Sequence, residues 1–181
     1  MNTLNSNFKM KLSGLVVLAA SLTAFNSAAQ AEDTESTLKP YAMTVHEDRA
    51  FGHSILKGDF DQAIRKLSAN PKLSVIPANA SNLCVAYAKA KDLDNAIAAC
   101  DAAVAELTSK KIAIDKHPNR FGESRVSVQT DLSIALSNRG VLFAVKGEHE
   151  KARKNFLAAL QLEYDRSRAE DNLARLDSVE S

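Results

Sequence analysis

The sequence predicts an all-α protein built from consecutive antiparallel helix pairs. Only six Gly and four Pro occur among 181 residues, which argues against an all-β fold with many tight turns. Apolar residues recur at intervals of three and four on both sides of a short polar turn, as they do on one face of a helix. The turn occurs three times along the chain, and helix pairs repeated in this way bury their apolar faces against one another.

Composition and charge fit one globular domain. Apolar residues make up 45% of the chain and charged residues 25%, close to the average for a soluble protein. The formal net charge is +1, and it becomes −1 when the two lysines among the first 31 residues are removed. A nearly neutral body lacks the broad positive field that holds nucleic acid or an anionic membrane. We therefore expect no nucleic-acid partner.

Residues 1–31 are typical of a cleavable signal peptide. Lys9 and Lys11 provide the positive start, and residues 12–25 form an apolar run. This run is shorter than the roughly 20 residues that span a bilayer, which disfavours an uncleaved anchor. Ala29-Gln30-Ala31 matches the small-residue cleavage pattern, so cleavage is expected after Ala31. The mature chain would then be periplasmic or secreted, with no membrane span.

The segment after the expected cleavage site is predicted to be a flexible leader. Residues 32–43 are mostly polar and contain Pro40, a composition that buries little apolar surface. We place the helical domain at 44–178. Either Met1 or Met10 fits as the start of translation.

A seven-residue pattern marks the turns between helices. It covers residues 57–63, 90–96 and 146–152. Gly58 and Gly147 suit the left-handed conformation that closes a helix, whereas Lys91 stands where Gly would be easier. Each copy is therefore expected to end one helix and begin the next.

The residues around these turns carry a family resemblance. In the third copy the matching positions are Asn138, Gly140, Phe143, Gly147, Ala152, Phe156 and Ala159. In the second copy they are Asn82, Leu83, Cys84, Tyr87, Ala96, Cys100 and Ala103, and the start of the pattern returns at Asn172-Leu173-Ala174. The chain resembles tetratricopeptide repeat (TPR) proteins of the exported bacterial type, whose repeats are 34 residues long.

The resemblance implies a short, right-handed α-solenoid with a C-terminal capping helix. Its repeats would lie at about 44–77, 78–107 and 131–164, with an insertion at about 108–130 and the capping helix at 166–178. A generic array of helical hairpins is the alternative. The insertion is rich in lysine and arginine, so it is either a basic rim of the binding groove or a solvated segment.

The function that the resemblance implies is binding of a protein or peptide partner on the concave face. The alternative is small-ligand binding, or a homo-oligomeric structural role in the cell envelope. The residues expected to line the concave face are Asn82, Val85, Lys89, Asn138, Val141, Val145, Arg168, Asn172 and Arg175.

No catalytic role is expected. The chain contains no GxSxG, GxxxxGK[ST] or GxGxxG motif, so neither an activated serine nor a phosphate-binding loop is indicated. Its histidines lack zinc-ligand spacing. These are His46, His53, His117 and His149. We therefore predict a non-enzyme without cofactor or metal.

The two cysteines leave two interpretations open. In the TPR register, Cys84 falls on the first helix of a pair and Cys100 on the second. Export to an oxidising compartment would allow a disulfide between them. The alternative is two small side chains buried in close helix packing.

Overall fold

The computed structural model describes residues 41–118, 124–162 and 166–180, and within these ranges all regular structure is α-helical. The predicted signal peptide, residues 32–40 of the predicted leader, and Arg120 in the predicted insertion lie outside the described residues. The helices are α2 (Gly52–Leu56), α3 (Phe60–Ser68), α4 (Pro71–Ser74), α5 (Pro77–Lys89), α6 (Leu93–Lys116), α7 (Arg125–Val145), α8 (His149–Leu160) and α9 (Arg166–Glu180).

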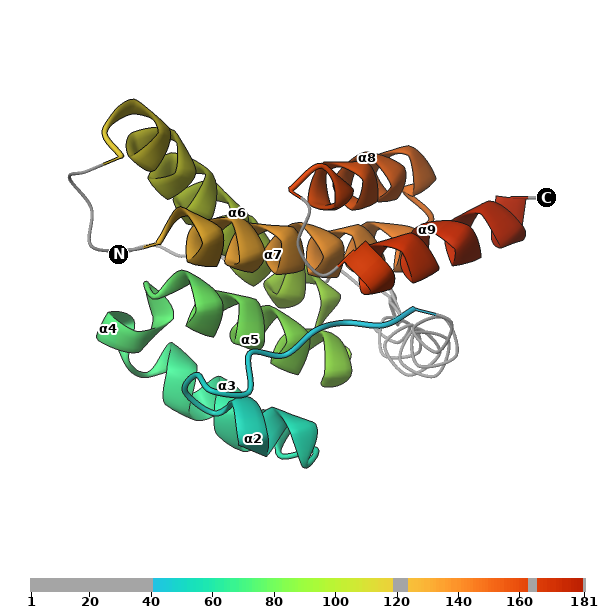
Figure 1. Ribbon diagram of the computed structural model, residues 1–181. Coiled ribbons are helices and arrows are strands. Elements are labelled where there is room, and N and C mark those ends of the chain that lie inside the picture. Colours follow the sequence, from blue (N-terminus) through green and yellow to red (C-terminus); the bar gives the residue numbers. More distant parts are fainter. Residues whose placement is uncertain (1–40, 119–123, 163–165, 181) are drawn as a thin grey trace, which may run out of the picture.

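The helices pack as sequential antiparallel neighbours, which confirms the predicted all-α class (Figure 1). From α5 to α9, each helix contacts the next one in the chain. Alternate helices also meet, because α7 contacts both α5 and α9. The helices α5, α7 and α9 therefore form one continuous face of the molecule. No helix in the described part of the chain is long and apolar enough to cross a membrane.

The three repeated turns share one backbone geometry. Gly58, Lys91 and Gly147 have φ values of 90°, 67° and 74°. After each of them, the next residue donates its N–H to a carbonyl in the last turn of the preceding helix, for example Asp92 N–H to Tyr87 O at 2.9 Å. This is the closing bond of a Schellman motif. The seven-residue pattern thus ends one helix and begins the next, as predicted, and Lys91 adopts a conformation that is easier for Gly.

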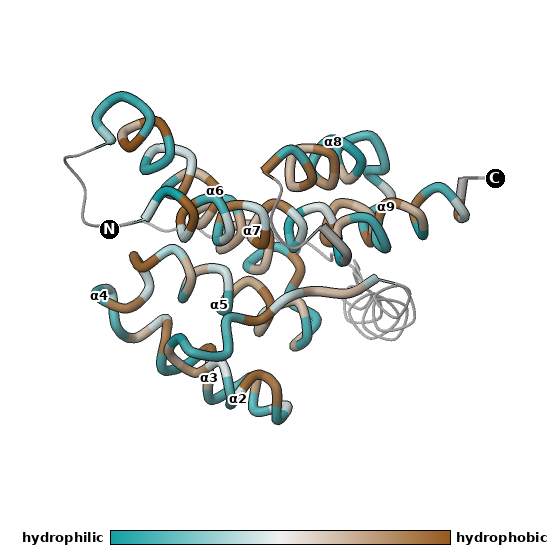
Figure 2. The backbone as a smooth tube through the Cα atoms, in the orientation of Figure 1, coloured by the Kyte–Doolittle hydropathy of each residue, from teal (hydrophilic) through white to brown (hydrophobic). Residues whose placement is uncertain are grey.

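Small residues let the paired helices approach closely. Ala63, Ala96 and Ala152, at the same position of each turn pattern, have no exposed surface. Gly140 on α7 faces Phe156 on α8, and a Cβ atom at Gly140 would lie only 2.5 Å from the phenyl ring. Figure 2 shows hydrophobic and hydrophilic positions alternating along the helices, as expected where one side of each helix is buried.

The region predicted as an insertion lengthens one helix pair. Residues 108–116 complete α6 and residues 125–130 begin α7. Ile114 and Val128 from these extensions are buried in a common apolar cluster. The carboxylate of Asp115 lies 2.7 Å from the Lys111 ammonium and 3.3 Å from the Arg125 guanidinium. Part of the basic charge in this region is therefore paired within the extension.

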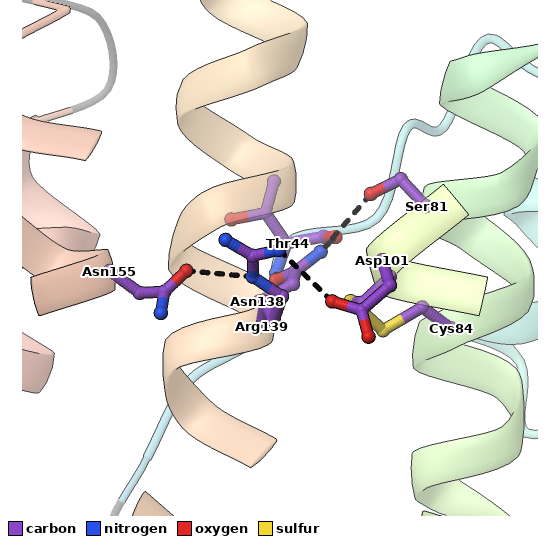
Figure 3. The surroundings of a disulfide bond; sticks show 8 residues. Thr44, Ser81, Cys84, Asp101, Asn138, Arg139 and Asn155 are labelled. Atoms are coloured by element: carbon purple, nitrogen blue, oxygen red, sulfur yellow. Dashed lines mark hydrogen bonds and ion pairs between the residues drawn. A yellow bond between two sulfur atoms is a disulfide. The ribbon is translucent and has the colours of Figure 1, made fainter. Parts of the chain in front are cut away.

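A disulfide between Cys84 and Cys100 joins α5 to α6, which decides between the two interpretations of the cysteines. The two Cα atoms lie 5.2 Å apart and both residues are fully buried. Close to the disulfide, Arg139 of α7 bonds to Asn155 of α8 and to Asp101 of α6 (Figure 3). A buried disulfide is consistent with an oxidising compartment.

We predict that removing the disulfide lowers stability. The bond closes a loop of sequence separation 16, for which loop-closure entropy gives about 3 kcal/mol. The double variant Cys84→Ala/Cys100→Ala should lose about this free energy of unfolding in urea, with its helical content retained. A double variant as stable as the wild type would contradict the prediction, and thiol labelling under denaturing conditions serves as the control for the bond itself.

Candidate functional site

The face formed by α5, α7 and α9 carries an extended segment of the chain's own N-terminal part. Residues 41–46, which we call the strap, run across the three helices in an order opposite to that of the helices in the sequence (Figure 1). The strap begins beside α9, passes α7 and ends beside α5. A short turn then leads into α2.

Each of the three helices holds the strap with one asparagine. The amide oxygen of Asn172 accepts the N–H of Ala42 at 2.9 Å, and its amide nitrogen donates to Ala42 O at 2.8 Å. Asn138 makes the same pair of bonds to Thr44, each at 2.8 Å. Every second residue of the strap therefore has both of its main-chain groups satisfied by one amide side chain.

The third asparagine completes this ladder of amide pairs. Asn82 accepts the N–H of His46 at 2.8 Å and donates to its carbonyl oxygen at 2.9 Å. Asn82, like the other two ladder asparagines, has no exposed surface. A buried amide costs free energy unless its donors and acceptor are paired. The main chain of the strap provides these partners for the three asparagine side chains.

The alternate residues of the strap make apolar contacts. Tyr41 and Met43 pack against the cluster that contains Val141 and Phe156. Met43 also joins the cluster around the disulfide, and together with Val45 it packs against Val85. Alternate residues of the strap thus make two kinds of contact. The main chain of residues 42, 44 and 46 bonds to the asparagines, and the side chains of residues 41, 43 and 45 bury apolar surface.

The other residues predicted to line the face differ in exposure. Val85 and Val141 are buried and Val145 is half-buried. Lys89 and Arg175 are exposed. The apolar members of the set therefore pack in the clusters that the strap contacts, whereas these charged members reach solvent.

Arg168 is exposed and donates to the carbonyl oxygen of Met43 at 3.4 Å, so it contacts the strap. A hollow of about 730 Å³ lies beside the strap, between α2 and α5. Its lining includes Met43, Phe60, Lys57 and Lys89. The strap therefore bonds to Arg168 and to the three asparagines, whereas Lys89 lies in the hollow beside it.

His46 is buried at the end of the strap. It is 8% exposed, its Nδ1 lies 3.7 Å from a carboxylate oxygen of Asp131 on α7, and its Nε2 has no hydrogen-bond partner among the described residues. Burial lowers the pKa of His46 below 6.5, and this outweighs the opposing effect of Asp131. Asp48 also raises the pKa and Arg49 lowers it, both by weaker charge effects.

The position of the strap corrects the predicted boundary of the flexible leader. Residues 41–43 fall within the predicted leader, yet Ala42 is bonded through both main-chain groups and the partly buried Met43 packs against the core. From Tyr41 to His46, larger apolar residues alternate with alanine, threonine and histidine, which is a pattern of an extended segment. That signal is present in the sequence, but nothing in it specifies a docking face.

Sequence reasoning also missed two residues that help to fix the end of the strap. Asn79 on α5 accepts the N–H of Ala50 at 3.2 Å, in the turn that follows the strap. Asp131 on α7 faces His46. Neither residue occupies a position that recurs in the repeated pattern, so the repeat gave no reason to select it.

Among the residues that the structure describes, no group of three or more His, Cys, Asp or Glu side chains is placed to hold a metal ion. Comparison of the chain with models of known protein families, with curated proteins and with solved structures found no match. The geometry of the face formed by α5, α7 and α9 is therefore the main indication of what the chain does.

We predict that Asn138→Ala destabilises the protein by about 2 kcal/mol, because it leaves the N–H and carbonyl of Thr44 unpaired or forces that part of the strap into water. Asn95→Ala is the matched control, since Asn95 is exposed and its side chain bonds to Asp92 within the same helix start. That control should change stability by less than about 0.5 kcal/mol. Urea denaturation measures both, and equal losses would contradict the assigned role of Asn138.

We predict that acid loosens the strap. Because the docked strap favours neutral His46, its contribution to stability is complete above pH 6.5 and declines as the pH falls from 6.5 towards the lowered pKa. Wild-type protein should therefore lose more stability than His46→Gln between pH 7.5 and pH 5. Parallel losses in the two proteins, measured by urea denaturation at each pH, would show that His46 does not titrate with docking.

Proposed function

We propose that this chain is a non-catalytic interaction module that binds an extended segment of a protein or peptide partner on the face formed by α5, α7 and α9. One observation carries the proposal: three amides at corresponding positions each pair with both main-chain groups of alternate residues in one extended segment. An amide used in this way recognises extended backbone, whatever side chain the residue carries. Apolar side chains beside the amides then supply selectivity.

The helix arrangement supports a TPR-type architecture as part of this proposal. The hairpins α5–α6 and α7–α8 would be two repeats, α9 would be the capping helix, and the whole would form a short right-handed solenoid. The left-handed turn residues, the buried alanines after them and the contact of Gly140 with Phe156 all favour this assignment. In such a solenoid the strap-bearing face would be concave.

The proposed location is the periplasm or the outside of the cell. The disulfide between Cys84 and Cys100 favours an oxidising compartment. The features of residues 1–31 agree with export by a cleavable signal peptide. A partner would accordingly be another exported protein, or a segment of a membrane protein that faces the same compartment.

The groups on this face support binding rather than catalysis. Asparagine amides and valine side chains offer hydrogen bonds and apolar surface. The one histidine of the strap, His46, is buried against Asp131 at the end of the strap. While the strap is docked, the His46 side chain is buried and a substrate cannot reach it.

A peptide screen tests the proposal. A library of short displayed peptides is selected on the immobilised full chain, and recovered sequences are resynthesised with a photoreactive group. We expect cross-links to residues of the strap-bearing face, such as Val85, Val141 and Val145. Cross-links confined to the surface around Arg139 and Asp101 would contradict the proposal.

Light scattering over a range of protein concentrations tests the alternative of a homo-oligomeric structural role. The chain supplies both the face and a segment that fits it, so a second copy offers the same segment as an occupant. A concentration-dependent assembly with no peptide recovered from the screen would favour that alternative. A monomer at all concentrations would remove it.

A further inference from the structure

While the strap lies across α5, α7 and α9, the residues best suited to hold a partner are already occupied. Asn82, Asn138 and Asn172 are fully buried, and each has both functions of its amide bonded to the strap. Val85 and Val141 are buried as well. A partner that uses this face cannot reach these groups until the strap leaves.

The strap also defines what can replace it. Residues 42, 44 and 46 need a free N–H and carbonyl, because both groups bond to an asparagine. Residues 41, 43 and 45 need apolar side chains, because Tyr41, Met43 and Val45 pack into the clusters beneath. A competing segment is therefore extended and has an apolar side chain at every second residue. It has no proline at the positions between them, because these face an asparagine.

The connection from the strap to the helices is short and strained. The N–H of Arg49 bonds to His46 O at 3.2 Å, and Phe51 follows with φ of 61°, a left-handed value that is unfavourable for a bulky residue. Gly52 starts α2 so close to the turn that a Cβ atom there would collide with the carbonyl oxygen of His46. Release of residues 41–46 requires none of the contacts between α5, α6, α7 and α8 to break.

From these observations we propose that residues 41–46 act as an internal competitor for the binding face. A partner enters by displacing the strap with an extended segment of the same alternating pattern, so the free protein holds its own site closed. This inference rests on the proposed function, because it assumes that the face binds an extended segment in trans. It adds the identity of the competitor and the pattern that a partner must match.

A strap-opened variant provides the test. Thr44→Pro removes the N–H that Asn138 accepts, and Thr44→Ser keeps that N–H as the matched control. The probe is a fluorescein-labelled peptide with the sequence of residues 39–48. We expect at least about tenfold tighter binding to Thr44→Pro than to wild type, because the tethered strap competes at an effective concentration in the millimolar range. Thr44→Ser should bind like the wild type.

A second peptide checks the register. When the labelled peptide itself carries Thr44→Pro, it loses the N–H that faces Asn138, and its affinity for the strap-opened protein should fall at least about tenfold. An unchanged affinity would mean that the peptide does not use the asparagine ladder. Circular dichroism and the intact disulfide verify that each protein variant is folded.

The outcomes separate the two proposals. Equal affinity of the probe for wild type and Thr44→Pro would overturn competition and leave the proposed function standing. No binding to folded Thr44→Pro would overturn the proposed function, and competition with it. A dimer of the wild type that Thr44→Pro dissociates would assign the face to a second copy and overturn competition within one chain.

Hydrogen exchange on the wild-type protein keeps the test independent of the variants. The amides of Ala42, Thr44 and His46 should exchange at least about tenfold faster than that of Val141 in the middle of α7, because the strap opens without unfolding the helices. Unlabelled probe peptide at saturation should accelerate their exchange further by displacing the strap. Strap amides as protected as Val141, and unaffected by peptide, would overturn the proposal.

Discussion

Asparagine amides buried on three neighbouring helices set the main constraint on this structure. A buried amide has to find both a donor and an acceptor, and an extended main chain offers the two together at every second residue. Asn82, Asn138 and Asn172 meet this requirement through the strap. The same bonds fix the register of the strap, because a shift by one residue would turn Tyr41, Met43 and Val45 away from their apolar contacts.

The three asparagines lie in a row because the helices that carry them pack in a regular, repeated way. Fully buried alanines follow the repeated turns, Gly140 makes room for the ring of Phe156, and the disulfide of Cys84 and Cys100 joins α5 to α6. Closely packed interiors resist rearrangement, because moving one side chain forces its neighbours to move. The helices therefore form a fixed framework, and the strap with its turn at residues 47–51 is the part whose release disturbs that framework least.

Polar and apolar contributions on this face are complementary. The asparagine bonds are directional and select an extended backbone, whereas the valines and the clusters beneath the strap select apolar side chains. Burial of His46 beside Asp131 adds a dependence on protonation at one end of the strap. The strap is therefore held by backbone conformation and side-chain pattern rather than by strong charge, which agrees with the nearly neutral composition of the chain.

Much of this arrangement was predictable from local sequence. The helical periodicity and the turn pattern with Gly58 and Gly147 follow from short-range rules. The expectation that Asn82, Asn138 and Asn172 share one face came from the resemblance to TPR proteins. The extension of α6 and α7 is recognisable in the sequence as extra length, and the structure shows that it forms additional helical turns in which Ile114 and Val128 are buried.

The sequence by itself determined the helical class and the positions of the turns, because these depend on residues close together in the chain. Only the tertiary structure decided that Cys84 bonds to Cys100 and that residues 41–46 lie across α9, α7 and α5. The contact of Ala42 with Asn172 spans 130 residues. Such a pairing leaves no local pattern, since it arises where separate helices bring their unsatisfied amides to one face.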